Sequence, residues 1–160
     1  MRHIFILSLL LLFQGIIGFT FGQSIENKIV GEWLTTDKDA IVKMHYGNKK
    51  GQSEDKIYGQ LIWLEEPNNE DGSPKKDKEN PKEILRKRTI LGLTIIKELE
   101  WDGDEDEWLW EDGSAYDPES GNTYSFKAYI DPERPNILNC RGYLGFSLLG
   151  RTEVWTRKNN

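Results

Sequence analysis

The residues of this chain best suited to binding a small molecule are arginines that stand among apolar residues or beside glycine. A guanidinium in such surroundings costs free energy unless an anion pairs with it. It can hold a carboxylate or a phosphate through two parallel hydrogen bonds. Gly142 follows Arg141 and removes a side chain that would keep a ligand at a distance. We therefore predict that Arg86, Arg88 and Arg141 bind a ligand.

Structural ion pairs are the alternative role for these arginines. The carboxylates of Asp77, Asp117 or Glu153 could neutralise them inside the protein. For Arg151 and Arg157, near Trp155 in the last apolar segment, a structural role is the expected one.

Arrangements typical of catalysis or of metal binding are missing from the sequence. After residue 22 there is one histidine, His45, and one cysteine, Cys140, and no Ser-His-Asp set, phosphate loop or dinucleotide fingerprint. The acidic residues of segment 102–107 lack the ligand spacing of a calcium loop, so we expect a solvated hairpin tip. Cys140 lies in an apolar segment and is expected to be an inert core residue. We predict no catalytic residue, no metal site and no cofactor.

The first 22 residues have the pattern of a signal peptide. Arg2 and His3 precede an apolar run over residues 4–13, and Gly22 is the expected cleavage point. The protein is then exported, to the periplasm or the extracellular space, without stable membrane insertion after cleavage. The alternative is an uncleaved membrane anchor, but the apolar run is shorter than a spanning helix requires.

Residues 23–160 are predicted to form one domain. The whole chain has a net charge of −6, which does not favour binding to nucleic acid. Six tryptophans, six tyrosines and six phenylalanines indicate a packed, aromatic-rich core. With a single cysteine there is no internal disulfide, so burial and sheet closure must stabilise the fold.

Short apolar segments separated by turn residues predict an all-β, antiparallel protein of about eight strands. Alternation is clearest in segment 123–130, where Tyr124, Phe126, Ala128 and Ile130 share one face. The expected strands are residues 29–36, 40–46, 56–64, 93–101, 107–111, 123–130, 137–143 and 148–157.

Two connections between these strands can be interpreted further. Asp117-Pro118 followed by Gly121 predicts a type I turn that closes on a glycine bulge. Residues 65–79 form a long polar loop, which is either a lid over a binding site or a solvated insertion. Asn80-Pro81 after this loop predicts one short helix over residues 81–87.

The two ends of the domain carry the strongest architectural signal. Gly31-Glu32-Trp33 opens the first strand, and residues 150–157 form an arginine-rich last strand. If these strands meet, the indole can cover the floor of a barrel while a guanidinium stacks on it. A closed sheet has no free edge and encloses a space that can hold a small molecule.

The order of several motifs resembles the DUF2147 family of exported bacterial proteins of unknown function. The resemblance spans nearly the whole domain, with a lengthened acidic turn at Glu105-Asp106-Glu107 as a departure. It implies a lipocalin-like, calycin-type up-and-down barrel, and it implies no activity, cofactor or catalytic residue. The motifs are Gly31-Glu32-Trp33, Gly59-Gln60-Leu61-Ile62-Trp63-Leu64, Asp77-Lys78-Glu79-Asn80-Pro81, Leu85-Arg86-Lys87-Arg88, Gly92, Tyr116-Asp117-Pro118, Gly121, Tyr124, Arg141-Gly142-Tyr143, Gly150-Arg151-Thr152 and Trp155-Thr156-Arg157.

The sequence as a whole predicts an exported protein that binds an unidentified small molecule in a barrel cavity. The ligand is expected to be partly apolar and anionic, held by the arginines and by the aromatic residues Tyr58, Trp63, Tyr124 and Phe126. One alternative is an enzyme that uses tyrosine, arginine and carboxylate groups inside the barrel. Another is a cell-envelope interaction module whose barrel is filled by side chains. The oligomeric state is left open.

Overall fold

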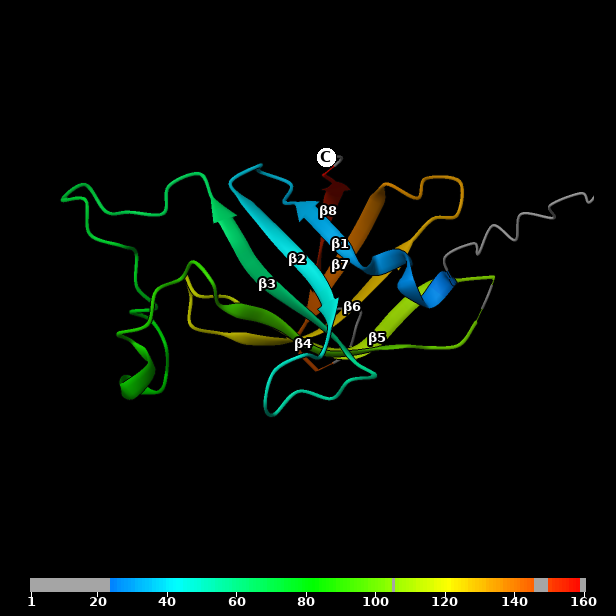
Figure 1. The fold of residues 1–160 in the computed structure, drawn as a ribbon, viewed down its shortest axis with the longest axis horizontal. Coiled ribbons are helices and arrows are strands. Elements are labelled where there is room, and N and C mark those ends of the chain that lie inside the picture. The colour runs from blue at the N-terminus through cyan, green and yellow to red at the C-terminus, as the bar shows by residue number, and fades with distance from the viewer. Residues whose placement is uncertain (1–23, 105, 146–149, 159–160) are drawn as a thin grey trace, which may run out of the picture.

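The computed structural model describes residues 24–104, 106–145 and 150–158, and it shows a closed barrel of eight antiparallel strands in chain order (Figure 1). The predicted signal peptide, residues 1–22, lies outside the described residues. Within the described part of the chain, no helix has the length and apolar character needed to cross a membrane. The strands are β1 (Gly31–Leu34), β2 (Ala40–Tyr46), β3 (Ile57–Leu64), β4 (Thr94–Trp101), β5 (Trp108–Tyr116), β6 (Thr123–Ile130), β7 (Ile137–Tyr143) and β8 (Gly150–Arg157).

The first and last strands close the barrel, as the two ends of the sequence predicted. In β1, Trp33 pairs with Arg157 of β8, and Leu34 pairs with Thr156. The opposite edge of β1 pairs with β2 through four residues. An up-and-down sheet whose ends pair in this way has no free edge, so the prediction of an all-β, antiparallel barrel of eight strands is confirmed.

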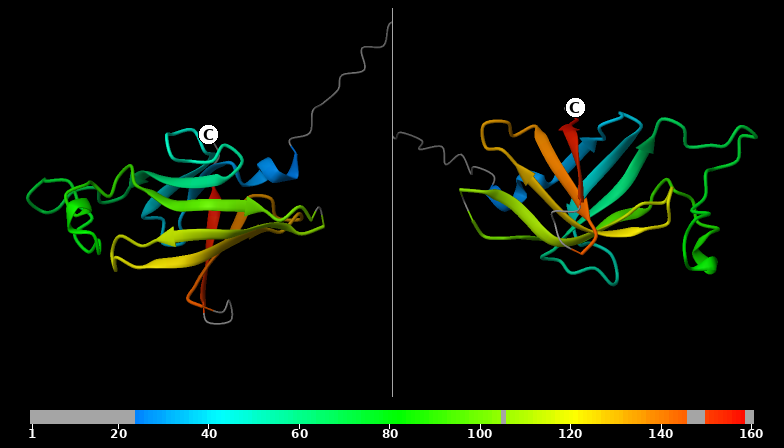
Figure 2. Two further views of the ribbon diagram at one scale, coloured as in Figure 1. Left: turned by 90° about the horizontal axis from the view of Figure 1, so that it is seen from below. Right: turned by 180° about the vertical axis from the view of Figure 1, so that it is seen from behind.

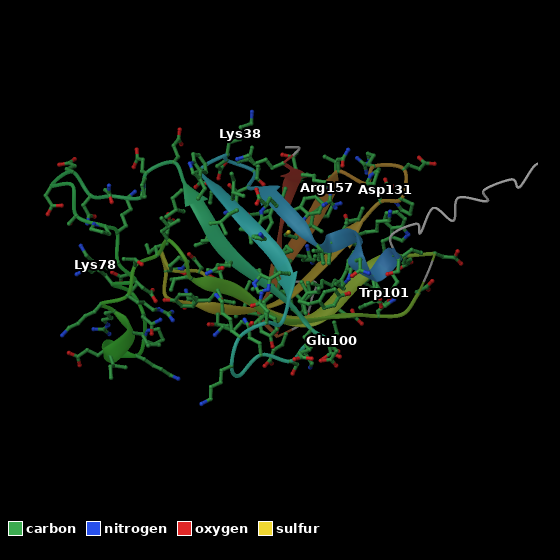
Figure 3. All side chains as sticks on the ribbon, viewed as in Figure 1. Lys38, Lys78, Glu100, Trp101, Asp131 and Arg157 are labelled. Atoms are coloured by element: carbon green, nitrogen blue, oxygen red, sulfur yellow. The ribbon has the colours of Figure 1, made fainter. Side chains whose placement is uncertain are left out.

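One end of the barrel is filled by large side chains and covered by the 3-10 helix η1 (Ile25–Ile29). Trp33 is fully buried, and its indole N–H donates a hydrogen bond of 2.8 Å to the carbonyl of Ile29. The rings of Trp101 and Trp110 lie 5.0 Å apart at the same end, and Figure 3 shows Trp101 close to η1. This end is the floor of the barrel.

The alternation predicted for β6 is confirmed. Phe126, Ala128 and Ile130 are buried, whereas Ser125 and Tyr129 are exposed on the other face. The turn before this strand is also as predicted. The carboxylate of Asp117 accepts hydrogen bonds from the Glu119 amide and the Ser120 hydroxyl, and Gly121 has a φ of 73°.

Strand β5 is longer than the five residues that the sequence predicted. It continues through Gly113, opposite an irregular stretch of β4. Glu98 and Asp112 both have positive φ there, and Leu99 turns into the core above Gly113. A Cβ atom on Gly113 would lie 2.8 Å from the Leu99 Cδ1 atom, so only glycine fits beneath that leucine.

Residues 65–92 form an insertion between β3 and β4 that stands away from the barrel next to the β5–β6 turn (Figures 1 and 2). The helix predicted over residues 81–87 is reduced to the 3-10 turn η2 (Glu83–Leu85), in which the Ile84 side chain is 86% exposed. The Asn80 side chain accepts a hydrogen bond from the Lys82 amide, but the Arg86 side chain folds back to the Asn80 carbonyl. Local side-chain bonds of this kind compete with continuation of a helix.

Candidate functional site

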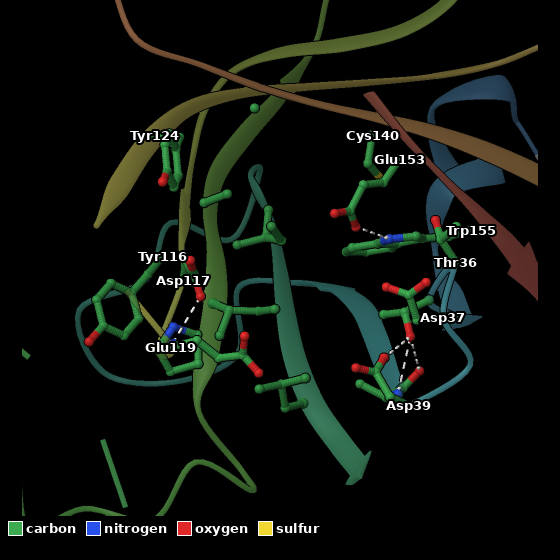
Figure 4. A pocket seen from close by; sticks show the side chains of 18 of the residues that line it. Thr36, Asp37, Asp39, Tyr116, Asp117, Glu119, Tyr124, Cys140, Glu153 and Trp155 are labelled. Atoms are coloured by element: carbon green, nitrogen blue, oxygen red, sulfur yellow. Dashed lines mark hydrogen bonds between the residues drawn. The ribbon is translucent and has the colours of Figure 1, made fainter. Parts of the chain in front are cut away.

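The end of the barrel opposite the floor opens into a cavity of about 970 Å³. Its wall is formed by residues of β2 to β8, and its mouth by the β1–β2 turn, the segment after β3 and the β5–β6 turn. Figure 4 shows labelled side chains from both sides of the mouth facing the space between them. Small-molecule sites in proteins commonly have volumes of roughly 300–1,000 Å³. The cavity is therefore large enough for an organic ligand.

The inner part of the cavity wall is apolar. Leu61 of β3, Ile96 of β4 and Phe126 of β6 line it and are almost completely buried. Two glycines show where the interior is filled and where it is open. A Cβ atom on Gly59 would lie 2.8 Å from the Met44 sulfur, whereas a Cβ atom on Gly142 would meet nothing closer than 3.7 Å. Gly142 lines the cavity, and a methyl group there would make only ordinary contact with Tyr124.

Strand β8 contributes a polar inner face to an otherwise apolar wall. Arg151, Glu153 and Trp155 alternate along this strand and all line the cavity. Arg151 is exposed at the mouth, Glu153 is half-buried and Trp155 is buried. The Trp155 indole N–H lies 3.3 Å from one oxygen of the Glu153 carboxylate, to which it donates a hydrogen bond (Figure 4).

Acidic residues dominate the charged part of the lining. The whole chain has 27 acidic and 21 basic residues. In the lining the acidic residues outnumber Lys75 and Arg151 by seven to two. The seven are Asp37 and Asp39 in the β1–β2 turn, Glu65 and Glu66 after β3, Asp117 and Glu119 in the β5–β6 turn, and Glu153 in β8.

The two basic residues neutralise only part of this charge. Lys75 lies 3.2 Å from Glu66, and Arg151 lies 3.7 Å from Glu153 with its side chain 80% exposed. Exposed ion pairs of this kind contribute little to the free energy of folding because water screens the attraction between the two charges. Within the described part of the chain, three further acids of the mouth have no side-chain hydrogen bond or ion pair: Asp37, Glu65 and Glu119.

The insertion is fastened to the cavity wall through one buried carboxylate. Asp77 is fully buried and accepts hydrogen bonds from Arg88 at 2.8 Å, Asn80 at 2.9 Å and the Tyr116 hydroxyl. Burial acts to raise the pKa of Asp77, but these donors outweigh it and hold the pKa below its ordinary value. Tyr116 itself lines the cavity, so this cluster joins the insertion to the site.

The predicted arginine anchors are not among the residues that line the cavity. Arg88 is bound to Asp77, and Arg86 donates to the Asn80 carbonyl, both within the insertion. Arg141 alternates with Cys140 on β7, and because Cys140 lines the cavity, Arg141 lies on the outer face. Its guanidinium donates a hydrogen bond of 2.9 Å to the hydroxyl of Thr152.

The four predicted aromatic residues divide into two pairs. Tyr124 and Phe126 line the cavity, as expected from their shared face of β6. Tyr58 is buried on the outside of β3, where its hydroxyl accepts a hydrogen bond of 3.0 Å from the Ser53 amide. Trp63 is 42% exposed, and neither Tyr58 nor Trp63 is a lining residue.

Other lining residues were missed by the sequence interpretation. Glu153 was considered only as a partner for arginines, although its alternation with Arg151 and Trp155 on a strand places all three on one face. Cys140 is a buried lining residue, and burial raises the pKa of its thiol well above the usual range, in agreement with an inert group. Among the described residues, no group of three or more histidine, cysteine or acidic side chains is arranged to hold a metal ion.

Comparison with known proteins supports the same architecture. Comparison with curated proteins gives no significant match. A solved structure that resembles this chain is protein HP1028 from the human pathogen Helicobacter pylori, which is described as belonging to the lipocalin family. The two chains are 24% identical with a TM-score of 0.64, over 82% of this chain and 83% of the other. At this level of identity the similarity shows a common fold.

The family assignment rests on the sequence of the barrel itself. The family model described as "Uncharacterized protein conserved in bacteria (DUF2147)" matches residues 31–157. These limits coincide with the first residue of β1 and the last residue of β8, so the match covers the closed barrel. The chain therefore belongs to the DUF2147 family.

Proposed function

We propose that this protein is an exported binding protein that holds a small, partly apolar molecule in the barrel cavity. The observation that carries the proposal is the cavity of about 970 Å³, which is open to solvent at one end and closed by a packed floor at the other. Export follows from the signal-peptide pattern of residues 1–22. The lipocalin-like fold supports small-molecule binding but does not name a ligand.

The charged residues around the cavity bear on the charge of the ligand. The sequence predicted an anion held by Arg86, Arg88 and Arg141, and that prediction requires these side chains to reach the bound molecule. They belong to the insertion and to the outer face of β7, whereas the charged residues of the lining are mainly acidic. Apolar contact with the inner wall is common to an anionic, a neutral and a cationic ligand.

Neither alternative function is favoured by a specific observation. The interaction module required a barrel filled by side chains, and the cavity removes that premise. For an enzyme, Tyr116 is the cavity hydroxyl with a perturbed pKa, but burial and the neighbouring Asp77 carboxylate raise that pKa. The hydroxyl already donates its hydrogen bond to Asp77, so it acts as a structural link.

The cavity can be tested with a neutral fluorescent probe. Titration of the mature protein with Nile red should give saturable fluorescence at about one probe per chain, because the inner wall is apolar. A phenylalanine at Gly142 would project into the cavity and take up part of its volume, so Gly142→Phe should weaken binding. Gly142→Ala adds only a methyl group at ordinary contact distance and should bind as the unchanged protein does.

Two results would overturn the proposal. One is a failure of the unchanged protein to bind the probe. The other is equal binding by the Gly142→Phe variant, provided that its thermal unfolding shows that it is folded. Native mass spectrometry of the protein purified from its own cells complements the titration, and a co-purifying mass that disappears in Gly142→Phe identifies the natural ligand.

A further inference from the structure

We infer that the cavity selects organic cations, and that the Glu153 carboxylate beside Trp155 receives the positively charged head group. This inference rests on the proposed function, since it names the class of molecule that the same cavity takes. Amines and quaternary ammonium groups share the required chemistry: a positive charge carried on an apolar body.

Glu153 lies part of the way down the cavity wall. The β7–β8 ladder runs inward from the mouth, where Gly150 pairs with Tyr143. Glu153 pairs with Cys140 three residues further in, and Trp155 pairs with Leu138, which is fully buried. Glu153 therefore lies between the exposed mouth and the packed floor. A ligand that enters the cavity would displace water from this carboxylate, which is costly unless a cation or hydrogen-bond donors compensate it.

The protein supplies little of that compensation. Within the described part of the chain, the Glu153 carboxylate contacts one indole N–H at 3.3 Å and the Arg151 guanidinium at 3.7 Å. The Arg151 side chain is 80% exposed at the mouth, so it is free of packing that would hold it on the carboxylate. The Glu153 side chain itself remains 39% exposed, in a residue that lines the cavity. A ligand cation can approach it without breaking a buried ion pair.

The surroundings of Glu153 add to the attraction. The Thr36 hydroxyl donates to the carbonyl of Val154 at 3.1 Å and accepts from its amide at 3.0 Å, which docks the β1–β2 turn on β8. Asp37 follows Thr36 and has no partner in the described part of the chain. Figure 4 shows Asp37 on the side of the mouth that carries Glu153 and Trp155. An indole next to carboxylates is a favourable site for a cation.

The remaining lining favours a cation with an apolar body over an inorganic ion. Buried apolar side chains such as Phe126 and Ile96 also line the cavity, and such surroundings do not suit a hydrated metal ion. Acidic residues on the opposite side of the mouth, Asp117 and Glu119, extend the negative potential across the entrance. Such a potential attracts cations and repels anions on approach.

The test uses three probes with the same eight-carbon chain and different head groups: octylamine, octanol and octanoate. Isothermal titration calorimetry at neutral pH and low salt should show octylamine binding about tenfold or more tightly than octanoate, with octanol between them. Glu153→Gln should lower the affinity for octylamine about tenfold and change that for octanol by less than about twofold, because only the charged contact is lost. The affinity for octanol shows that the variant keeps a folded cavity.

Glu133→Gln is the matched control, because it removes the same charge from the exposed β6–β7 turn at the floor end. It should leave all three affinities unchanged within about twofold. Equal affinities for octylamine and octanoate, a preference for octanoate, or an unchanged preference in Glu153→Gln would each overturn the assignment of a cationic ligand. The proposed function would still stand in these cases if Gly142→Phe weakened the binding of octanol. Both proposals would be wrong only if Gly142→Phe left the affinities for all three probes unchanged.

Discussion

The guanidinium carbon of Arg157 lies 4.1 Å from the centroid of the Trp33 ring, at the point where the last strand meets the first. The same guanidinium donates hydrogen bonds to the carbonyls of Val30, at 3.0 Å, and Lys28. It passes directly over Gly31, where a Cβ atom would lie 2.6 Å from Nη1. Arg157 thus fastens β8, η1 and the floor indole together, and Figure 3 shows it beside the end of β1. Burial lowers the pKa of Arg157, but an arginine stays charged in this setting.

Replacing Arg157 should destabilise the barrel more than replacing an exposed arginine. Arg157→Met removes two charge-assisted hydrogen bonds and the contact with the indole, and we expect a loss of about 2 kcal/mol in the free energy of unfolding. Arg134→Met is the control, because that side chain is 66% exposed and pairs with Asp131 on the surface. It should cost less than about 0.5 kcal/mol. Chemical denaturation of both variants measures the difference, and equal losses would contradict this role for Arg157.

Alanine should destabilise the protein at one glycine and leave its stability nearly unchanged at another. Gly113→Ala places a methyl group 2.8 Å from Leu99 Cδ1 and 3.1 Å from the Leu99 Cα atom, so the core must shift. We expect a loss of about 1–3 kcal/mol, the usual cost of overpacking. Gly142→Ala meets only Tyr124 atoms at 3.7 Å or more and should change stability by less than about 0.5 kcal/mol. Thermal unfolding of the two variants distinguishes a filled site from an open one.

The contribution of Asp77 to stability should depend on pH. Its pKa is lowered in the folded protein, so its stabilising effect is fully present above the unfolded-state pKa of about 3.9. The effect is lost as the pH falls through the folded-state value, because the protonated group gives up its pairing with Arg88. At neutral pH, Asp77→Asn should cost about 2 kcal/mol.

The comparison is made by denaturation at several pH values. The stability difference between the unchanged protein and Asp77→Asn should stay constant from pH 7 to about pH 5 and then narrow as the pH falls below about 4. The pKa of Asp71 is also lowered, through hydrogen bonds from Ser73, but its carboxylate is on the surface. Asp71→Asn should therefore change stability much less than Asp77→Asn. A difference that stays constant down to pH 2 would show that Asp77 does not titrate as inferred.

Processing of the N-terminus tests the predicted export. Expression of the full chain in a bacterium with a secretion pathway should give a mature protein that begins at Gln23, recovered outside the cytoplasm. Intact-mass measurement identifies the cleavage point. Replacing two apolar residues, Leu10 and Leu11, by arginine should prevent export and leave the full-length chain in the cytoplasm. Recovery of an uncleaved chain from the membrane fraction of the unchanged protein would instead favour the anchor.

The sequence predicted those parts of the fold in which local pattern and tertiary structure agree. The bounds of β2, β6 and β7 are as predicted, because each strand lies between turn residues and carries a run of apolar or alternating residues. The sequence underestimated β5, because Asp112-Gly113 looks like a turn. The strand continues there only because Leu99, from another strand, packs on the glycine. A contact between distant segments of this kind is not visible in a local pattern.

The candidate site was harder to predict for a related reason. Whether a strand residue faces the cavity depends on the phase of the alternation, and irregular pairing changes that phase. The β2–β3 ladder shifts register between Ile41 and Val42, and Tyr58 and Trp63 of β3 are not lining residues. The prediction that arginines bind the ligand gains no support at Arg88 for a different reason. Asp77, eleven residues before Arg88, satisfies that side chain within the insertion, which the sequence had left as one of two possibilities.

The shortest ladder in the barrel is the seam between β1 and β8, where two residue pairs are in register, compared with seven between β7 and β8. Because this ladder is so short, local unfolding of the barrel should begin with separation of β1 from β8. The amides of Leu34 and Thr156 should therefore exchange with deuterium earlier than those in the middle of β7. The Arg157 side chain contacts the Val30 carbonyl and the Trp33 ring across this seam. Small movements of the two strands should therefore leave the packing of the floor unchanged.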